Sequence, residues 1–433
     1  MKSVLLLSPT SRERNQIPSI AAELGFNVIF DDFDGDYFDD FLGANPDFNR
    51  PELDILELIE RTAEKYSNAN LAGVTSAVGY PGMSAASIIA ERLALPGPPV
   101  EAVMLCEHKY YARLHGRRHV PDATPAFHLL DPQDDRTLSG ALGFPSFLKP
   151  VKGCMSRNAF RVQNTKELTQ LVNTSGLPHR FITPFNDMLR AYTGFPPNAS
   201  CLLQEELLYG LQVSLEGYVH RGTITVLGII DAIMFPGSSS FKRFQYPSAL
   251  PLDVQERMVA IASRFFSGIG YDNALFNMEL FFDSRSDRIT IIEVNPKIAS
   301  QFPNLFEKVD GFSTYRTLLE VATGQRPTTR AGKGRHRIAA SCVLRTFQDQ
   351  KIVAIPTAEE KADVLKRFPD TYIQVYAKPG RRLSDEVQDS YSYRYGLIDL
   401  GAKNEADLEE KLAACKQMLS FRFEPAGRIT MEN

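Results

Sequence analysis

The sequence predicts an α/β protein of several lobes, and three observations support this fold class. Apolar strands alternate with amphipathic helices through the first hundred residues, which favours a parallel sheet. A long polar β-hairpin is predicted around residue 286. A basic, glycine-containing link at 328–337 then precedes a last α/β segment. We therefore expect four units, at 1–100, 101–205, 206–327 and 328–433.

Composition limits the classes of partner. Of the 433 residues 43% are hydrophobic and 23% are charged, which is ordinary for a globular protein. A net charge of -4 gives no reason to expect nucleic acid or an anionic membrane as partner. No apolar run has the length of a membrane span, and "MKSVLLLSPTSRER" is typical of a first strand rather than a secretory segment. Five scattered cysteines without a CxxC predict reduced thiols and a cytoplasmic location.

In the first unit, "SVLLLS", "NVIFDDF" and "LAGVTSAV" are predicted strands. The segments between and after them, "IPSIAAELGF", "RPELDILELIERTAEKYS" and "SAASIIAERLAL", are predicted helices. Leu56, Ile59, Ala63 and Tyr66 recur at helical spacing in the second of these.

The second unit is expected to begin its sheet with the strands "FPSFLKPV" and "NAFRV" around a polar loop, followed by the helix "TKELTQLVNTSG". Residues 181–200 are rich in Pro, Asn and Gly, so we expect an irregular surface excursion there. "CLLQEEL" and "VSLEGYVHRGTITVLGIID" are predicted strands, the latter with a turn at Arg221-Gly222. "LDVQERMVAIASRFFSGIG" and "EADLEEKLAACKQML" are predicted helices.

The hairpin "ALFNMELFFDSRSDRITIIEVN" carries the sharpest chemical pattern. Its turn places Glu279 and Glu293 at or next to opposite positions, and Asn295 points the same way as Glu293. Like charges opposed on one face destabilise a sheet unless a cation lies between them. Two carboxylates and an amide oxygen suit Mg2+. A solvent-facing hairpin that tolerates the two acids is the alternative, at about even odds from the hairpin alone.

Basic residues precede the hairpin. Lys149 ends a strand, and the loop "VKGCMSRNA" after it offers Gly153, Ser156 and backbone N–H groups to a phosphate chain. Lys109 in "CEHKYYAR" is a further candidate. A single lysine at a strand end is usually a surface residue, so each of these patterns is weak alone.

A polar corner lies in "LLQEELLYGLQVSLEG". Glu205 and Glu206 precede an apolar step at Leu207, an arrangement that suits the edge of an adenine, with Glu205 or Gln212 toward an amino or ribose group. Taken alone, an ordinary strand, turn and strand is the favoured interpretation.

The order of these elements resembles the ATP-grasp superfamily over essentially the whole chain. A lysine, a second lysine with a flexible loop, an acidic corner and Glu…Glu-x-Asn-Pro-basic follow one another, and the last is the most specific. The resemblance implies an ATP-grasp fold: a Rossmann-like N-terminal domain at 1–100, a lid subdomain at 101–205, a large subdomain with the metal site at 206–327, and a C-terminal lobe.

The same resemblance implies ATP and Mg2+ as cofactors, with two ions expected and Mn2+ as a substitute. Lys109 and Lys149 would contact phosphates, and the loop 151–158 with Ser156 would be the lid. The other implied roles are the adenine hinge (Glu205, Glu206, Leu207), the ribose contact (Gln212, with Glu216 as its substitute) and the metal ligands (Glu279, Glu293, Asn295).

The reaction that the resemblance implies joins a small-molecule carboxylate to an amine through an acyl phosphate. Lys297 stands where the family usually has arginine, and it brings the charge without the bidentate fork. That leaves Arg243 to clamp a substrate carboxylate. Gln301 replaces a glutamate that serves bicarbonate chemistry in biotin-dependent carboxylases, and the run Ser300–Pro303 looks more like the branch that joins amino acids.

Two alternatives stay open at this point. One is a carboxylating or carbamoyl-forming relative, and the other is an ATP-binding module that has lost catalysis. The expected partners are small molecules, with neither nucleic acid nor membrane, and a homodimer is left open.

Overall fold

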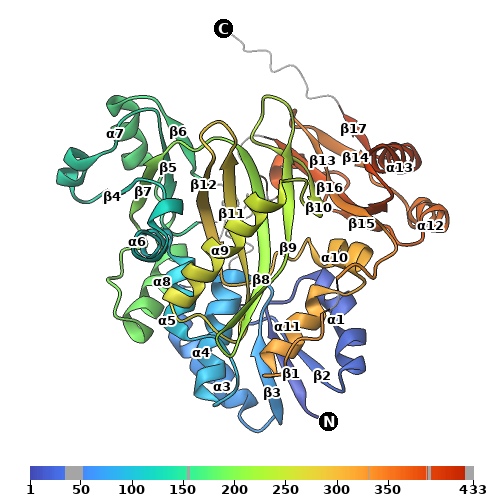
Figure 1. The fold of residues 1–433 in the computed structure, drawn as a ribbon, viewed down its shortest axis with the longest axis horizontal. Helices are drawn as coiled ribbons and strands as arrows, with labels where there is room; N and C mark the ends of the chain where they lie inside the picture. Colours follow the sequence, from blue (N-terminus) through green and yellow to red (C-terminus); the bar gives the residue numbers. More distant parts are fainter. Residues whose placement is uncertain (35–51, 154–156, 330, 387, 389–391, 425–433) are drawn as a thin grey trace.

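The computed structural model describes residues 1–34, 52–153, 157–329, 331–386, 388 and 392–424. It contains an N-terminal parallel sheet, a four-stranded antiparallel sheet, an eight-stranded sheet and a small two-stranded one. In Figure 1 the N-terminal unit lies at the bottom, the four-stranded sheet at the left and the C-terminal lobe at the right of the large sheet.

The N-terminal unit is the predicted parallel sheet, in the order β2-β1-β3. Its strands are short and largely apolar: β1 (Ser3–Leu7), β2 (Asn27–Asp31) and β3 (Leu71–Thr75). The helices of this part and of the link that follows are α1 (Ser11–Glu23), α3 (Ile55–Tyr66), α4 (Ser84–Arg92), α5 (Val100–Glu107) and α6 (Lys109–His119). A capping box on Thr10 and Glu13 begins α1.

The four-stranded sheet has the order β4-β7-β5-β6, with all neighbours antiparallel. It comprises β4 (Phe127–Leu130), β5 (Ser146–Pro150), β6 (Phe160–Val162) and β7 (Leu202–Glu206), with α7 (Thr165–Thr174) after β6. The expectation of an irregular excursion at 181–200 is wrong, because α8 (His179–Tyr192) occupies most of it. Its buried residues have helical spacing that the flanking Pro and Asn obscured: Phe181, Ile182, Phe185, Met188 and Leu189.

The eight-stranded sheet has the order β12-β11-β8-β9-β10-β13-β16-β15. Its first five strands are β8 (Leu211–His220), β9 (Thr223–Met234), β10 (Phe241–Tyr246), β11 (Ala274–Asp283) and β12 (Arg288–Asn295). The predicted turn at Arg221-Gly222 joins β8 to β9, and both residues have positive φ. Helix α9 (Leu252–Gly268) crosses this part of the sheet (Figure 1).

The C-terminal lobe extends the same sheet. Strand β13 (Ile338–Thr346) pairs with β10, and β16 (Tyr393–Ala402) and β15 (Tyr372–Val375) follow. The remaining elements of this lobe are β14 (Lys351–Ala354), β17 (Arg422–Glu424), α12 (Ala358–Arg367) and α13 (Glu405–Met418).

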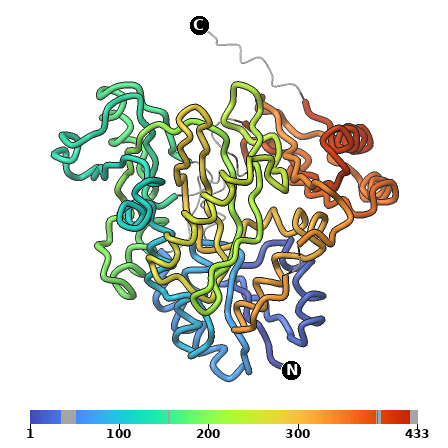
Figure 2. The backbone as a smooth tube through the Cα atoms, in the orientation of Figure 1, coloured from blue at the N-terminus to red at the C-terminus, as the bar shows by residue number. Residues whose placement is uncertain are grey.

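Two helices after the hairpin, α10 (Pro303–Asp310) and α11 (Thr314–Ala322), bring the chain back to its beginning. Helix α11 contacts α1 and β3, and Figure 2 shows this orange segment beside the blue N-terminal one. Arg12 at the start of α1 also reaches the C-terminal lobe, where its Nη1 lies 3.2 Å from Asp399 Oδ2. The N-terminal unit is thus anchored to both neighbouring parts of the chain.

Candidate functional site

The β11–β12 hairpin has the predicted register. Glu279 directly opposes Glu293, and Asn277 opposes Asn295, so the expected juxtaposition of the two carboxylates is confirmed. Directly opposed residues share one face, and Asn295 lies on the same face as Glu293.

The two carboxyl groups titrate differently. Burial and the neighbouring Glu293 raise the pKa of Glu279 to about 7, although Lys297 and Lys109 act against the shift. Burial also acts on Glu293, but attraction to Lys109 and Lys149 prevails and lowers its pKa. The pair therefore carries an electrostatic conflict that a bound cation would relieve.

Lys109 connects the hairpin to the loop after β5. It begins α6, and its Nζ lies 2.8 Å from Glu293 Oε1 and donates a hydrogen bond of 2.9 Å to the Gly153 carbonyl. Lys109 and the hairpin carboxylates are thus brought together. Ser156 lies outside the described residues, so its predicted phosphate contact stays a prediction.

The side chain of Lys149 contacts the backbone of the same hairpin. The register of β12 shifts beside Glu279, so that Ile292 has no partner on β11, and the Ile292 carbonyl accepts from Lys149 Nζ at 3.3 Å. Arg113 of α6 donates to this carbonyl at 2.5 Å. The irregularity therefore provides an acceptor that holds two cations beside the carboxylate pair.

Glu205 is the buried anion that pairs with both of these cations, Arg113 and Lys149. Its carboxylate lies 2.6 Å from Lys149 Nζ and is also hydrogen bonded to Arg113. Burial would raise the pKa of Glu205, but Arg113 and Lys149 hold it below the ordinary value. The pKa of Lys149 is lowered by burial and, to a smaller extent, by Arg113, while Glu205 opposes that shift.

The side chain of Glu205 is therefore engaged by Arg113 and Lys149. Its predicted contact with an amino or ribose group of a nucleotide stays a prediction. Glu205 alternates inward on β7 and is 2% exposed. Glu206 lies 2.7 Å from Arg288, and its backbone N–H donates to the Ala126 carbonyl at 3.0 Å. Leu207 is partly exposed directly after β7. An adenine contact through the Glu205–Leu207 backbone stays a prediction.

Gln212 lies on β8 next to the carboxylate pair. Its Nε2 donates to Glu279 Oε2 at 3.0 Å. The structure thus joins Gln212 to Glu279, while the ribose contact expected of Gln212 stays a prediction.

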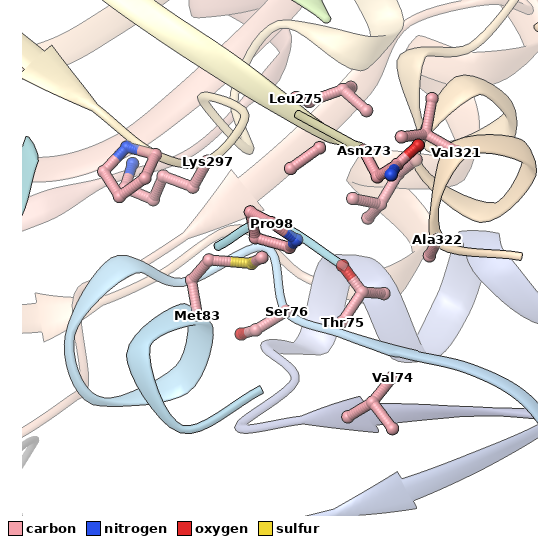
Figure 3. A pocket seen from close by; sticks show the side chains of 13 residues that line it. Val74, Thr75, Ser76, Met83, Pro98, Asn273, Leu275, Lys297, Val321 and Ala322 are labelled. Carbon is pink, nitrogen blue, oxygen red and sulfur yellow. The ribbon is translucent and has the colours of Figure 1, made fainter. Parts of the chain in front are cut away.

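Lys297 follows the hairpin and lies between the large sheet and the N-terminal unit. It lines a cavity of about 10 Å³ together with Pro98 and Asn273 (Figure 3). That volume suits about one water molecule. The missing side chain of Gly79 leaves room for the Glu107 carboxylate, because a Cβ there would lie 2.5 Å from Glu107 Oε1, while its 3.5 Å distance to Lys297 Cδ would be an ordinary contact.

Arg243 does not join this group, and the expectation that it clamps a substrate carboxylate is corrected. The ladder from Glu279 through Ser214 leads to Ile230, which packs with Phe244 on one face of the sheet. Arg243 precedes Phe244 and so points to the opposite face. There its guanidinium forms ion pairs with two residues of α13: Glu405 and Glu409.

Three charged residues near the hairpin were not predicted from the sequence: Arg113, Glu107 and Lys152. Lys152 forms an ion pair with Glu107, and its ammonium lies 4.7 Å from the Tyr80 ring centroid. Arg113 follows Lys109 by four residues, so helical spacing alone would have placed both on one face of α6. The Lys152–Glu107 pair spans 45 positions and has no such pattern.

The donor set of the hairpin fits a hard divalent cation. Oxygen ligands from Glu279, Glu293 and the Asn295 amide are the kind that Mg2+ prefers, with phosphate oxygens completing its shell. Across the described ranges, no cluster of three or more His, Cys, Asp or Glu residues is arranged as a metal site. A site that depends on a substrate for its remaining ligands agrees with this finding.

Comparison with known families decides the identity of the central region. Residues 142–303 match the model of the ATP-grasp domain. The chain carries an ATP-grasp domain. All the hairpin residues above lie within this ATP-grasp domain, as do Lys149, Glu205 and Gln212.

Solved structures extend the ATP-grasp likeness to almost the whole chain. L-amino acid ligase from Bacillus licheniformis is 18% identical with a TM-score of 0.71, covering 98% of this chain and 99% of its own. Carboxyaminoimidazole ribonucleotide synthase from Aspergillus clavatus, complexed with ATP, is 14% identical with a TM-score of 0.65, covering 96% and 98%.

A biotin carboxylase domain gives a third likeness. This domain of the 2-oxoglutarate carboxylase from Hydrogenobacter thermophilus, in complex with MgADP and bicarbonate, is 14% identical with a TM-score of 0.64, covering 97% of this chain and 90% of its own. No curated protein sequence matches the chain. At these identities the structural likenesses establish the fold alone.

None of the helices in the described parts of the chain is long and apolar enough to cross a membrane. The cysteines in those parts, Cys106, Cys201, Cys342 and Cys415, are all buried free thiols.

Proposed function

We propose that the chain is an ATP-dependent ligase that joins a small-molecule carboxylate to an amine, with amino acids as the substrate class. One observation carries the proposal: the opposed carboxylates of Glu279 and Glu293 meet the cations Lys109 and Lys149 on one side of the hairpin. Carboxylate oxygens that can ligate a metal and lysines that can neutralise phosphates are the two parts of a metal–polyphosphate site. Free buried thiols support a cytoplasmic setting.

In the proposed site, the lysines contact the phosphates of the nucleotide and the carboxylates contact the metal. Lys109 and Lys149 neutralise phosphate oxygens, and Lys109 contacts Gly153 in the loop 151–158. Residues 154–156 of this loop lie outside the described residues, so its role as a lid stays a prediction. Glu279, Glu293 and Asn295 would hold Mg2+, with Mn2+ as a substitute, and a second ion would bind with the nucleotide. The metal supplies neutralisation of phosphate charge during transfer.

Two displacements form the amide bond. An oxygen of the substrate carboxylate attacks the γ-phosphorus, the bond to the β–γ bridging oxygen breaks, and ADP leaves with the electron pair. The amine nitrogen then attacks the carbonyl carbon of the acyl phosphate, loses a proton to solvent, and releases phosphate. Lys297 stabilises charge on the phosphoryl oxygens during these steps.

An amine fits this site better than bicarbonate. Gln301, directly before α10, is an amide and does not take up a proton as a general base would. An amine nucleophile needs no obligatory general base, so the site is chemically complete for amide formation without one.

The deciding experiment is a phosphate-release screen of amino-acid pairs with Mg-ATP, followed by mass analysis of the product. We expect ADP and phosphate to form only when both an acid and an amine are present, with a product mass equal to their sum less one water. ADP formation that requires bicarbonate and no amine would favour the carboxylating alternative. Tight nucleotide binding without turnover of any pair would favour an inactive module.

The raised pKa of Glu279 gives a pH dependence that needs no substrate. A proton and a cation compete for this carboxylate, so Mn2+ affinity in the presence of ADP should fall by about 10-fold per pH unit below pH 7 and level off above it. The groups that face Glu279 are Glu293, Lys297, Lys109 and Lys149. Attraction to the lysines lowers the pKa of Glu293, away from this range, and burial lowers the pKa of Lys149.

Titration of bound Mn2+ by electron paramagnetic resonance between pH 6 and 8 measures this dependence. Glu279→Gln is the matched control, because its amide does not titrate while ADP and the neighbouring Glu216 are unchanged. We expect weaker binding and a flatter profile in that variant. Equal slopes in both proteins would contradict the assignment of Glu279.

A further inference from the structure

Three polar side chains form a ladder across the large sheet. Glu216 on β8 pairs directly with Asn277 on β11, which pairs directly with Asn295 on β12. Asn295 Nδ2 donates to Asn277 Oδ1 at 3.2 Å, and Asn277 Nδ2 donates to Glu216 Oε1 at 2.7 Å. All donors run in one direction, from the hairpin edge toward Glu216.

The buried end of the ladder fixes this direction. Glu216 is fully buried and Asn277 is 2% exposed, so water does not compete for their hydrogen bonds. Glu216 Oε1 also accepts the backbone N–H of Ala299, so it acts as an acceptor, and Asn277 turns its NH₂ group to Glu216 and its oxygen to Asn295. Asn295 must then turn its NH₂ group toward Asn277. Its Oδ1 is left available on the side of Glu293.

That orientation matters because only the oxygen of an asparagine amide ligates a hard cation. An Asn295 amide rotated by 180° would present its NH₂ group to the metal and repel it. Nothing within Asn295 itself prefers one orientation of the amide. The orientation is therefore set by Glu216 on β8, two strands away, through Asn277.

Glu216 also controls the segment after the hairpin. The same Oε1 accepts the backbone N–H of Ala299 at 3.0 Å, two residues beyond Lys297. Its Oε2 is buried and has no hydrogen-bond partner among the described residues. Burying a carboxyl group with one unsatisfied oxygen is costly, which is a reason to expect that the group serves a function.

We infer that Glu216 is a positioning residue for the metal site, acting through Asn277 to aim the Asn295 oxygen at the cation. The inference rests on the proposed function, because it requires that Asn295 is a metal ligand. It adds a residue of β8 that touches neither nucleotide nor metal.

Glu216→Leu, of similar volume and without an acceptor, tests the ladder. We expect Mn2+ affinity in the presence of ADP to fall by about 10- to 100-fold, the usual loss when a residue that orients a ligand is removed. ADP affinity measured in excess EDTA should not change. Glu216→Gln keeps an acceptor oxygen for Asn277, so it should retain Mn2+ affinity close to that of the wild type.

A double-mutant cycle with Asn295→Ala separates positioning from a general effect on folding. If Glu216 acts through Asn295, Glu216→Leu should cost little further Mn2+ affinity in the Asn295→Ala background. Full additivity of the two losses would overturn the inference, as would a folded Glu216→Leu variant with wild-type Mn2+ affinity. Asn277→Leu breaks the ladder at its middle and serves if Glu216→Leu does not fold.

The outcomes also distinguish this inference from the proposed function. Absence of Mn2+ binding by the wild type with ADP would overturn both. A wild type that binds Mn2+, weakened by Asn295→Ala and unaffected by Glu216→Leu and Asn277→Leu, would overturn the ladder alone.

Discussion

Replacing Glu293 with alanine should lower ADP formation by about 1,000-fold, because the change removes one of two opposed carboxylates and frees a cation at the same time. Lys109, now without its ion-pair partner, would bind phosphate oxygens without the metal that bridges them. The measurement is the steady-state rate of ADP release with a substrate pair found by the phosphate-release screen. Calorimetric titration with ADP and Mg2+ gives a second readout that needs no substrate pair.

Asp283→Ala is the matched control for this prediction. Asp283 ends β11, the strand that pairs with β12 of Glu293. It pairs with Arg288 across the hairpin and lies 3.2 Å from the exposed Arg285. Its loss should leave turnover within about twofold, since exposed ion pairs contribute little. Glu293→Gln preserves shape and guards against a folding defect. Turnover near the wild-type rate in both Glu293 variants would refute the metal assignment.

Replacing Arg113 with leucine should lower the free energy of unfolding by about 3 kcal/mol. Arg113 and Glu205 are each 3% exposed, and the change leaves a buried carboxylate with Lys149 as its one remaining cation. The hydrogen bond from Arg113 to the Ile292 carbonyl is lost as well. Chemical denaturation followed by tyrosine fluorescence measures the loss.

Two comparisons make this second prediction specific. The double variant Arg113→Leu/Glu205→Leu removes the uncompensated charge and should regain part of the lost stability. Arg257→Leu, at the exposed pair with Asp287, should change stability by less than about 1 kcal/mol. An Arg113→Leu loss no larger than that of Arg257→Leu would show that the buried group contributes nothing.

Local patterns were sufficient for the register of the β11–β12 hairpin. A polar turn between two alternating strands sets the register, and register alone brings Glu279 opposite Glu293. The order of the N-terminal strands and helices was readable for the same reason, since each element carries its own periodicity. The irregularity at Ile292 was not readable, because an extra residue in one strand leaves no mark in its composition.

Ion pairs between residues far apart in the chain could not be predicted from the sequence. Nothing near Arg243 indicates that α13 would supply two glutamates to the opposite face of the sheet from Glu279. Glu205 was expected at a nucleotide edge, and its cations come from 92 and 56 positions away, at Arg113 and Lys149. Helix α8 was missed for a different reason, because the Pro, Asn and Gly content of residues 181–200 favoured an irregular segment.

The pairing of β10 with β13 limits how this protein can be dissected. The link at 328–337 marks a change in sequence character, yet backbone hydrogen bonds cross from one side of it to the other. A fragment that stops before the link would leave β10 as an unpaired edge strand, which favours aggregation with other copies of the fragment. Expression trials that seek a minimal catalytic unit should therefore keep the C-terminal lobe attached.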